Sequence, residues 1–323
     1  MSAQRRASVS GLTAAEHAVL LAVEECTATA EDSFAPTTEV LELVDARTGL
    51  GPRYAQRIVR DLIVDWVRHV PLLDGDGNFG SVGGDEGADA RYTKVRLAPV
   101  GELALAAERG EVGPLPLDLI EGSLYRGGGI PPFDPAVTVR ALLVGAAPGS
   151  TPRTPTGTIT VDPTGPVRRN GRWVQRYQLG AVIRTGPGPD QLVLTEPPFL
   201  VGTDTIAAHL RDRLEQARRR AKFEDAPPNY APSSFVPSET VPLRDVTDLT
   251  SGRTGTQIVL QLTKGIDVID AVDWVRSVWP VTVHVDCVSY EEIYDRFALW
   301  SDLDTSGVHA LDELLNRLDP TAD

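Results

Sequence analysis

The chain has few cysteines and no long apolar segment, and each scarcity excludes a class of protein. Its 323 residues include two cysteines, Cys26 and Cys287. They are far apart and unlike a metal-ligand cluster, so they favour a reducing cytoplasm. No run of about 18 apolar residues occurs, and the N-terminal MSAQRRASVSGL lacks an apolar core. We therefore expect a cytoplasmic protein that is neither secreted nor embedded in a membrane.

Basic residues are also scarce. Lysine and arginine together number 31 against 45 aspartates and glutamates, which gives a net charge of -14. A protein whose whole surface grips phosphate groups has the opposite sign of charge. The composition allows a local basic groove, and it predicts DNA binding that is weak and sensitive to salt. The length is sufficient for two domains with their own cores.

The most informative segment is residues 71–97, PLLDGDGNFGSVGGDEGADARYTKVRL. A glycine-rich stretch leads into Tyr92, which lies between Arg91 and Lys94, with Arg96 following. A phenol has a pKa near about 10, so it needs a cation or a base beside it to act as a nucleophile. A fixed cation also stabilises the charge of an attacked phosphate. On a strand, Lys94 and Arg96 would share a face with Tyr92. The alternative is an ordinary strand tyrosine among solvated basic residues.

This segment resembles the active-site stretch of type IIA DNA topoisomerases. The gyrase and topoisomerase A subunits carry PLVDGQGNFGS followed by an RYTE-type motif. The resemblance implies that Tyr92 attacks a DNA phosphodiester and that Arg91 is the cation beside it. The basic side chains of Lys94 and Arg96 are themselves predicted to bind DNA. Further along the chain, Thr195 to Pro197 and residues 257–262 resemble other segments of the same protein family.

The resemblance also implies a reaction and its partners. It indicates a divergent, truncated A-subunit-like isomerase that cleaves and rejoins both strands of duplex DNA through a 5′-phosphotyrosyl link. Magnesium and ATP would enter only through a B-type partner subunit, and no metal ligands are expected in this chain. The assembly would be a homodimer within a heterotetramer, without a membrane. The alternative is a non-cleaving DNA-binding or regulatory relative of the A subunit.

Local patterns predict three helices before the tyrosine. Thr13 and Glu16 indicate the N-terminus of the first helix through a capping box. Thr37 or Thr38 would cap the second helix. The third, within residues 51–70, is strongly periodic and is expected to bury Ile58, Leu62 and Trp66. Helices followed by a turn-rich β segment indicate the winged-helix arrangement in which the family carries its tyrosine.

The expected fold class is α+β, with a winged-helix DNA-breakage domain followed by a tower-like α/β domain. Residues 1–11 would form a flexible arm and residues 12–110 the breakage domain. Residues 111–134 would be a connector. Residues 135–323 would form the tower-like domain with a C-terminal helical segment. We expect the sheet of this last domain to be mainly antiparallel.

The chain departs from the family where the family's third helix begins. Counting back from Pro71 places Thr48 and Leu50 on the positions of two family histidines, and only Gly51 is kept. Arg53 and Arg57 could replace the histidines as DNA-binding residues, or they could be a solvated helix face. The nearest candidates for a side chain that wedges between base pairs are Leu124 and Tyr125.

Two segments are similar to calcium-binding loops. In the first, Phe79 occupies the position that requires glycine, so the match fails. The second has carboxylate or hydroxyl ligands at the expected positions, although His309 takes the place of an apolar residue. This second candidate comprises Asp302, Asp304, Ser306, Gly307 and Glu313. Its alternative is a hairpin leading into a long helix.

Overall fold

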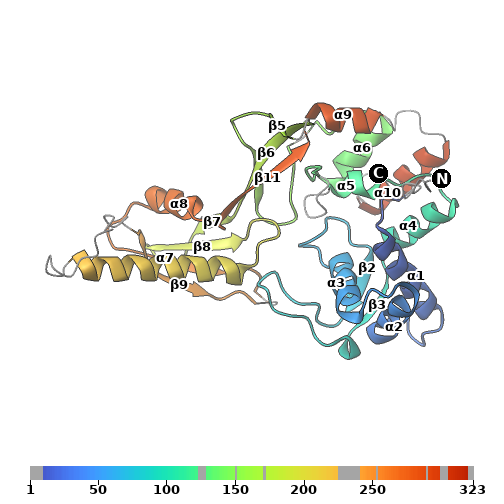
Figure 1. The fold of residues 1–323 in the computed structure, drawn as a ribbon, viewed down its shortest axis with the longest axis horizontal. Coiled ribbons are helices and arrows are strands. Elements are labelled where there is room, and N and C mark those ends of the chain that lie inside the picture. The colour runs from blue at the N-terminus through green and yellow to red at the C-terminus, as the bar shows by residue number, and fades with distance from the viewer. Residues whose placement is uncertain are drawn as a thin grey trace.

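The structure, a computed structural model, describes residues 10–122, 129–149, 151–169, 172–224, 241–251, 254–288, 290–298 and 305–318. Most of the described helices lie at one end of an elongated molecule, and the other end combines a sheet with helices that pack against it (Figure 1). Every strand pair within the described residues is antiparallel. The mixed helix and sheet class predicted above is therefore confirmed. Leu124, Tyr125 and residues 1–9 of the expected arm lie outside the described residues.

Short strands alternate with helices in the N-terminal part of the chain. In chain order these elements are α1 (Ala14–Ala28), β1 (Ala35–Pro36), α2 (Thr37–Thr48), α3 (Pro52–Ile63), β2 (Leu73–Asp76), η1 (Ala90–Tyr92), β3 (Lys94–Leu97) and α4 (Pro99–Arg109). The strands form a small sheet in the order β1-β3-β2. The buried faces of α1, α2 and α3 pack into the same core as Val95 of β3.

The first helix begins as predicted. The Thr13 hydroxyl accepts a hydrogen bond from the Glu16 amide at 3.2 Å, and the Glu16 carboxylate accepts one from the Thr13 amide at 2.8 Å. This reciprocal pair satisfies two amides that a helix start otherwise leaves unpaired. The capping box predicted from the sequence is confirmed.

The other two helices differ from the prediction. Pro36 precedes α2 and Thr37 is its first helical residue, so neither threonine caps the helix. The buried face of α3 consists of Ala55, Val59 and Leu62. The predicted burial of Leu62 is confirmed, whereas Ile58 is only partly buried beside this face and Trp66, also partly buried, follows the end of the helix at Ile63. The apolar periodicity thus predicted the position of the helix in the chain but not which of its faces contacts the core.

Two helices from the middle of the chain and two from its C-terminal part also pack into this core. They are α5 (Leu117–Glu121), α6 (Pro135–Leu143), α9 (Tyr290–Ala298) and α10 (Thr305–Leu318). Val139 of α6, Phe297 of α9 and Leu314 of α10 are buried in the same cluster as α1 to α4. The C-terminal helical segment, which the sequence grouped with residues 135–323, thus packs beside the N-terminal helices.

The second calcium-loop candidate is contradicted over the residues that the structure describes. Helix α10 begins at Thr305, so Ser306 and Gly307 lie in a helix rather than in an open loop. Glu313 lies on the same helix and forms an ion pair with Arg317 at 2.5 Å. Asp302 and Asp304 lie outside the described residues. A calcium loop turns sharply at its sixth position, which is Gly307 here, and a helix that runs through this position excludes the turn.

A middle sheet connects the helices to the far end of the molecule. It contains β4 (Thr158–Val161), β5 (Val167–Arg169), β6 (Arg172–Gly180) and β11 (Thr282–Val288), with β6 between β4 and β11. Tyr177 and Leu179 of β6 are buried against Phe199. Because β6 leads outward and β11 leads back, this sheet carries the chain to the far end and returns it (Figure 1).

We call the far end of the molecule the outer lobe. It comprises β7 (Val182–Thr185), β8 (Gln191–Glu196), α7 (Thr203–Glu224), β9 (Leu243–Asp248), β10 (Ile258–Leu262) and α8 (Val268–Ser277). The strands pair in the order β7-β8-β10-β9, and α7 and α8 pack against that sheet. Buried side chains such as Leu194, Leu260 and Ile206 fill the space between. No described helix is both long and apolar enough to cross a membrane.

Candidate nucleic-acid interface

Tyr92 lies in a short 3-10 turn just before β3. The Asp89 carboxylate accepts a hydrogen bond from the Arg91 amide at 3.1 Å, and the Asp89 carbonyl accepts one from the Tyr92 amide at 2.8 Å. The tyrosine is 72% exposed, so a large substrate can reach its oxygen. The strand prediction is correct for Lys94 and Arg96 but wrong for Tyr92. The alternation that was expected to place Tyr92 on their face therefore does not apply.

Arg91 lies next to the phenol, and its charge is already matched. Its guanidinium carbon is 5.9 Å from the centre of the Tyr92 ring. Arg91 Nε and Nη2 donate to the two Asp89 carboxylate oxygens at 3.0 and 3.3 Å. These hydrogen bonds hold the pKa of Asp89 below its ordinary value. The pair is exposed, and exposed pairs contribute little to stability, so a phosphate could replace the carboxylate.

The two basic residues of β3 are paired as well. Lys94 Nζ lies 2.5 Å from the Asp32 carboxylate, and Arg96 Nε lies 2.9 Å from that of Asp74. The Arg96 guanidinium also stacks on the Phe34 ring, with its carbon 4.5 Å from the ring centre. The sequence showed these cations but did not show their partners.

The arginines of α3 are less closely paired with acidic residues than the basic residues of β3 are. Arg57 is largely exposed, and its nearest acid, Asp61, is 3.9 Å away. Within the described part of the chain, Arg53 and Arg60 form no ion pair. Arg60 is not among the site residues predicted from the sequence. It follows Arg57 by three residues and Arg53 by seven, and this helical spacing is the signal that could have identified it.

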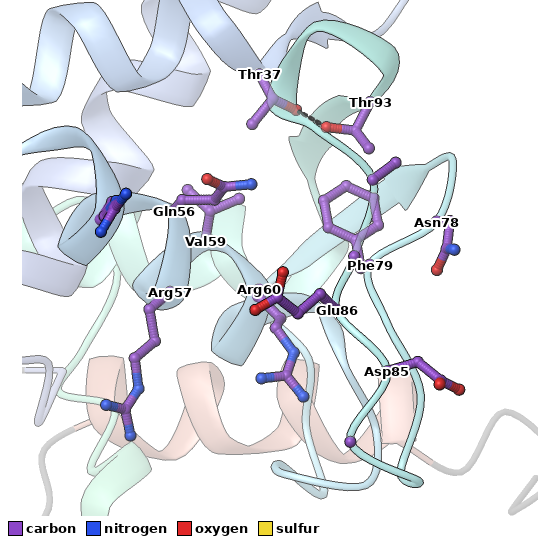
Figure 2. A pocket seen from close by; sticks show the side chains of 14 residues that line it. Thr37, Gln56, Arg57, Val59, Arg60, Asn78, Phe79, Asp85, Glu86 and Thr93 are labelled. Carbon is purple, nitrogen blue, oxygen red and sulfur yellow. Dashed lines mark hydrogen bonds between the residues drawn. The ribbon is translucent and has the colours of Figure 1, made fainter.

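These arginines line a pocket of about 530 Å³ between α3 and the glycine-rich loop, residues 77–89 (Figure 2). Asn78, Phe79, Asp85 and Glu86 of the loop form the opposite wall. The structure thus brings α3 and the loop together, while Arg96 and Asp74 line a separate pocket beside α4.

The pocket reaches the residue that follows Tyr92. Thr93 is buried, and its hydroxyl donates to the Thr37 hydroxyl at 2.8 Å, as drawn in Figure 2. The Thr37 amide donates to the Thr93 carbonyl at 3.1 Å. The first turn of α2 therefore holds the backbone beside Tyr92, which is the role that Thr37 has in place of the predicted helix cap.

No protein-family model matches the chain. The chain is similar to the A subunits of DNA gyrase. It is 31% identical to the gyrase A protein of Aminobacterium colombiense over 191 residues, covering 46% of this chain and 23% of that protein. The gyrase A protein of a Nocardioides species is 26% identical over 237 residues, covering 61% and 23%. A stretch of 42 residues is 52% identical to the topoisomerase 4 A protein of Neisseria gonorrhoeae, covering 13% and 6%. The chain thus spans less than a quarter of the gyrase proteins that it matches.

Polar side chains of the glycine-rich loop form hydrogen bonds within the loop itself. The Asn78 side chain accepts from the Gly80 amide at 2.8 Å, and the Asp85 carboxylate accepts from the Ser81 hydroxyl at 2.6 Å. The Ala88 amide donates to the Asn78 carbonyl at 2.8 Å. Among the described residues there is no group of three or more His, Cys, Asp or Glu side chains that could hold a metal ion.

The tip of the loop contacts the outer lobe. The amides of Thr203 and Asp204, at the start of α7, donate to the carbonyls of Val82 and Gly83, each at 3.4 Å. Gly84 has φ +95, and a Cβ added there would lie 2.9 Å from the Asp204 carboxylate. The loop that precedes Tyr92 is therefore held between α3 on one side and α7 on the other.

We expect Gly84→Ala to loosen this contact. The added methyl group meets Asp204 and the backbone is strained, so the free energy of unfolding should fall by roughly 1–3 kcal/mol. Gly165→Ala is the matched control, because Gly165 has φ +75 and nothing within 4 Å of an added Cβ. Denaturant titration of both variants compares them, and equal losses would show that Asp204 imposes no steric limit.

Proposed function

We propose that the chain is a type IIA topoisomerase A-subunit-like protein that cleaves and rejoins duplex DNA through Tyr92. The observation that carries the proposal is the exposed Tyr92 beside Arg91, at the end of the glycine-rich loop that resembles the family's active-site segment. The similarity to the gyrase A proteins supports the same family.

The topology supports the fold that the family uses. The chain order α1, β1, α2, α3, β2, β3 forms three helices and a small antiparallel sheet, with residues 77–89 as a long loop between β2 and η1. That arrangement supports a winged-helix assignment for residues 12–110. The outer lobe, reached through the middle sheet, supports a tower-like assignment within residues 135–323.

In the proposed reaction the Tyr92 oxygen bonds to phosphorus and the bond from phosphorus to the 3′ oxygen breaks. The phenol gives up its proton and the departing 3′ oxygen takes one up, so the step balances. The 5′ phosphate remains on Tyr92, and the reverse attack by the 3′ oxygen rejoins the strand. Arg91 exchanges Asp89 for the reacting phosphate, where a fixed cation stabilises the charge that develops.

Duplex DNA would lie across α3 and β3. Arg53 and Arg57 are the cations most available to it, while Lys94 and Arg96 would first release Asp32 and Asp74. Two copies of the chain would each contribute one Tyr92. Magnesium and ATP would enter through a B-type partner subunit in a heterotetramer, and that partner would supply the metal ligands.

A specific observation favours the alternative, a non-cleaving DNA-binding or regulatory relative. Thr48 and Leu50 stand where the resemblance places two histidines. The Thr48 hydroxyl donates to the Val44 carbonyl at 2.6 Å, and Leu50 packs against the helical core. Both residues serve the fold, and neither can move a proton between pH 5 and 8 as a histidine can.

We expect DNA binding by the isolated chain to be weak and steeply dependent on salt. Few cations offset a net charge of -14, and about three phosphate contacts predict a loss of affinity of roughly fortyfold for a fourfold rise in salt. Fluorescence anisotropy with a labelled duplex, titrated at several salt concentrations, measures this slope. A nanomolar dissociation constant that hardly changes with salt would contradict the expectation.

A further inference from the structure

The pocket between α3 and the glycine-rich loop concentrates positive charge on a strongly acidic protein. Arg53, Arg57 and Arg60 line it against Asp85 and Glu86, so the lining carries three positive and two negative groups. Elsewhere near Tyr92, each of Arg91, Lys94 and Arg96 has an acid within about 3 Å. The arginines of the pocket are therefore more available to a ligand than these three basic residues.

One buried N–H group of Arg60, that of Nε, lacks a hydrogen-bond acceptor among the described residues. Buried donors are nearly always bonded, and leaving a charged one without an acceptor is costly. Figure 2 shows the Arg57 and Arg60 side chains leaving α3 on the same side. A guanidinium pair of this kind suits an anion with several oxygens.

The acidic groups of the pocket are not equivalent. Asp85 is engaged within the loop, because its carboxylate accepts from the Ser81 hydroxyl at 2.6 Å. Glu86 forms no ion pair with a described residue, although it lines the pocket opposite Arg60. Its charge therefore opposes an incoming anion and partly neutralises the arginines from a distance.

We propose that this pocket binds one phosphate group, with Arg60 as its principal ligand, Arg57 as a second ligand and Glu86 as an opposing charge. The lining of the pocket includes Thr93, the residue that follows Tyr92, so a bound phosphate would lie in the same pocket as the backbone next to Tyr92. A nucleic-acid backbone is the source that fits the proposed function, on which this part of the inference rests. A free phosphate or pyrophosphate has the same chemistry and is the other source.

The first test measures binding of a labelled DNA duplex as a function of salt. Arg60→Gln should weaken binding about tenfold and lower the salt slope by about 0.9, the value for one lost phosphate contact. Arg60→Lys keeps the charge and should keep the slope. Glu86→Gln should strengthen binding severalfold. Arg276→Gln is the matched control, because it removes an exposed arginine of α8 and should change neither quantity.

The second test does not depend on a variant. Phenylglyoxal modifies accessible arginines of the wild-type chain, and mass spectrometry of its proteolytic peptides can follow Arg57 and Arg60 separately. Protection of Arg60 by the duplex, and by pyrophosphate only at much higher concentration, supports a nucleic-acid phosphate. Protection by pyrophosphate but not by duplex keeps the phosphate site and removes the nucleic-acid source. DNA binding with no protection of Arg60, or an unchanged slope in Arg60→Gln, overturns the inference and leaves the proposed function standing.

Discussion

A mixture of the chain with a B-type topoisomerase partner, magnesium and duplex DNA should yield a covalent protein–DNA product that survives denaturation. Tyr92→Phe should abolish this product, because it keeps the ring and its contacts but removes the attacking oxygen. DNA affinity should hardly change, since the ring is exposed and the cations remain. Electrophoresis of the denatured mixture with end-labelled DNA detects the product and shows whether the 5′ end is attached.

Arg91→Ala tests the neighbouring cation. Loss of one group that stabilises developing charge costs about 3 kcal/mol, so cleavage should slow on the order of a hundredfold. Tyr54→Phe is the matched control for Tyr92→Phe, because Tyr54 is also an exposed tyrosine but lies on α3, away from the turn that carries Tyr92. If the wild-type chain forms no product with any B-type partner and equals Tyr92→Phe in every assay, the cleavage proposal fails and the non-cleaving alternative stands.

Arg68→Ala should lower the free energy of unfolding by about 3–5 kcal/mol. The side chain is 1% exposed and joins two buried acids. Arg68 Nη1 donates to Glu16 at 3.0 Å, while Nε donates to Glu121 at 2.9 Å and Nη2 contacts its other oxygen. Without the arginine, two carboxylates remain in the core with no cation between them. Denaturant titration followed by circular dichroism measures the loss.

Two further variants separate burial from charge. Arg47→Ala removes an exposed pair with Glu25, and it should cost less than about 1 kcal/mol. The triple variant Arg68→Met, Glu16→Gln, Glu121→Gln should recover part of the stability, because it removes the buried charges together. Equal losses for Arg68→Ala and Arg47→Ala would show that the buried pairs are no more important than the surface one.

Local signals in the sequence were sufficient for several features. The capping box of α1 depends on two residues three apart, Thr13 and Glu16, and the structure confirms it. The adjacency of Arg91 and Tyr92 is a property of the chain itself, so the structure could only add their exposure and the 5.9 Å contact. The mixed fold class also followed from helical patterns that precede a turn-rich β segment in the sequence.

Patterns of nearby residues in the sequence did not predict which face of a helix is buried or whether a segment forms a loop. The periodicity of α3 favoured Ile58 and Trp66 as buried residues, but helix packing selected Ala55 and Val59 instead. An amphipathic pattern has a broad apolar face, and the neighbouring helices decide which part of it is covered. In the same way, a ligand spacing in residues 302–313 suggested calcium, whereas from Thr305 onward the backbone is helical.

The sequence by itself determined the candidate nucleophile, its neighbouring cation and the shortage of basic charge, because each is a contiguous motif or a count. Only the tertiary structure decided which cations are available. Asp32 and Asp74 pair with Lys94 and Arg96 from 62 and 22 residues away, while Arg60 faces a pocket without a partner among the described residues. Ion pairing and burial depend on distances between segments that chain folding brings together, and no local pattern encodes those distances.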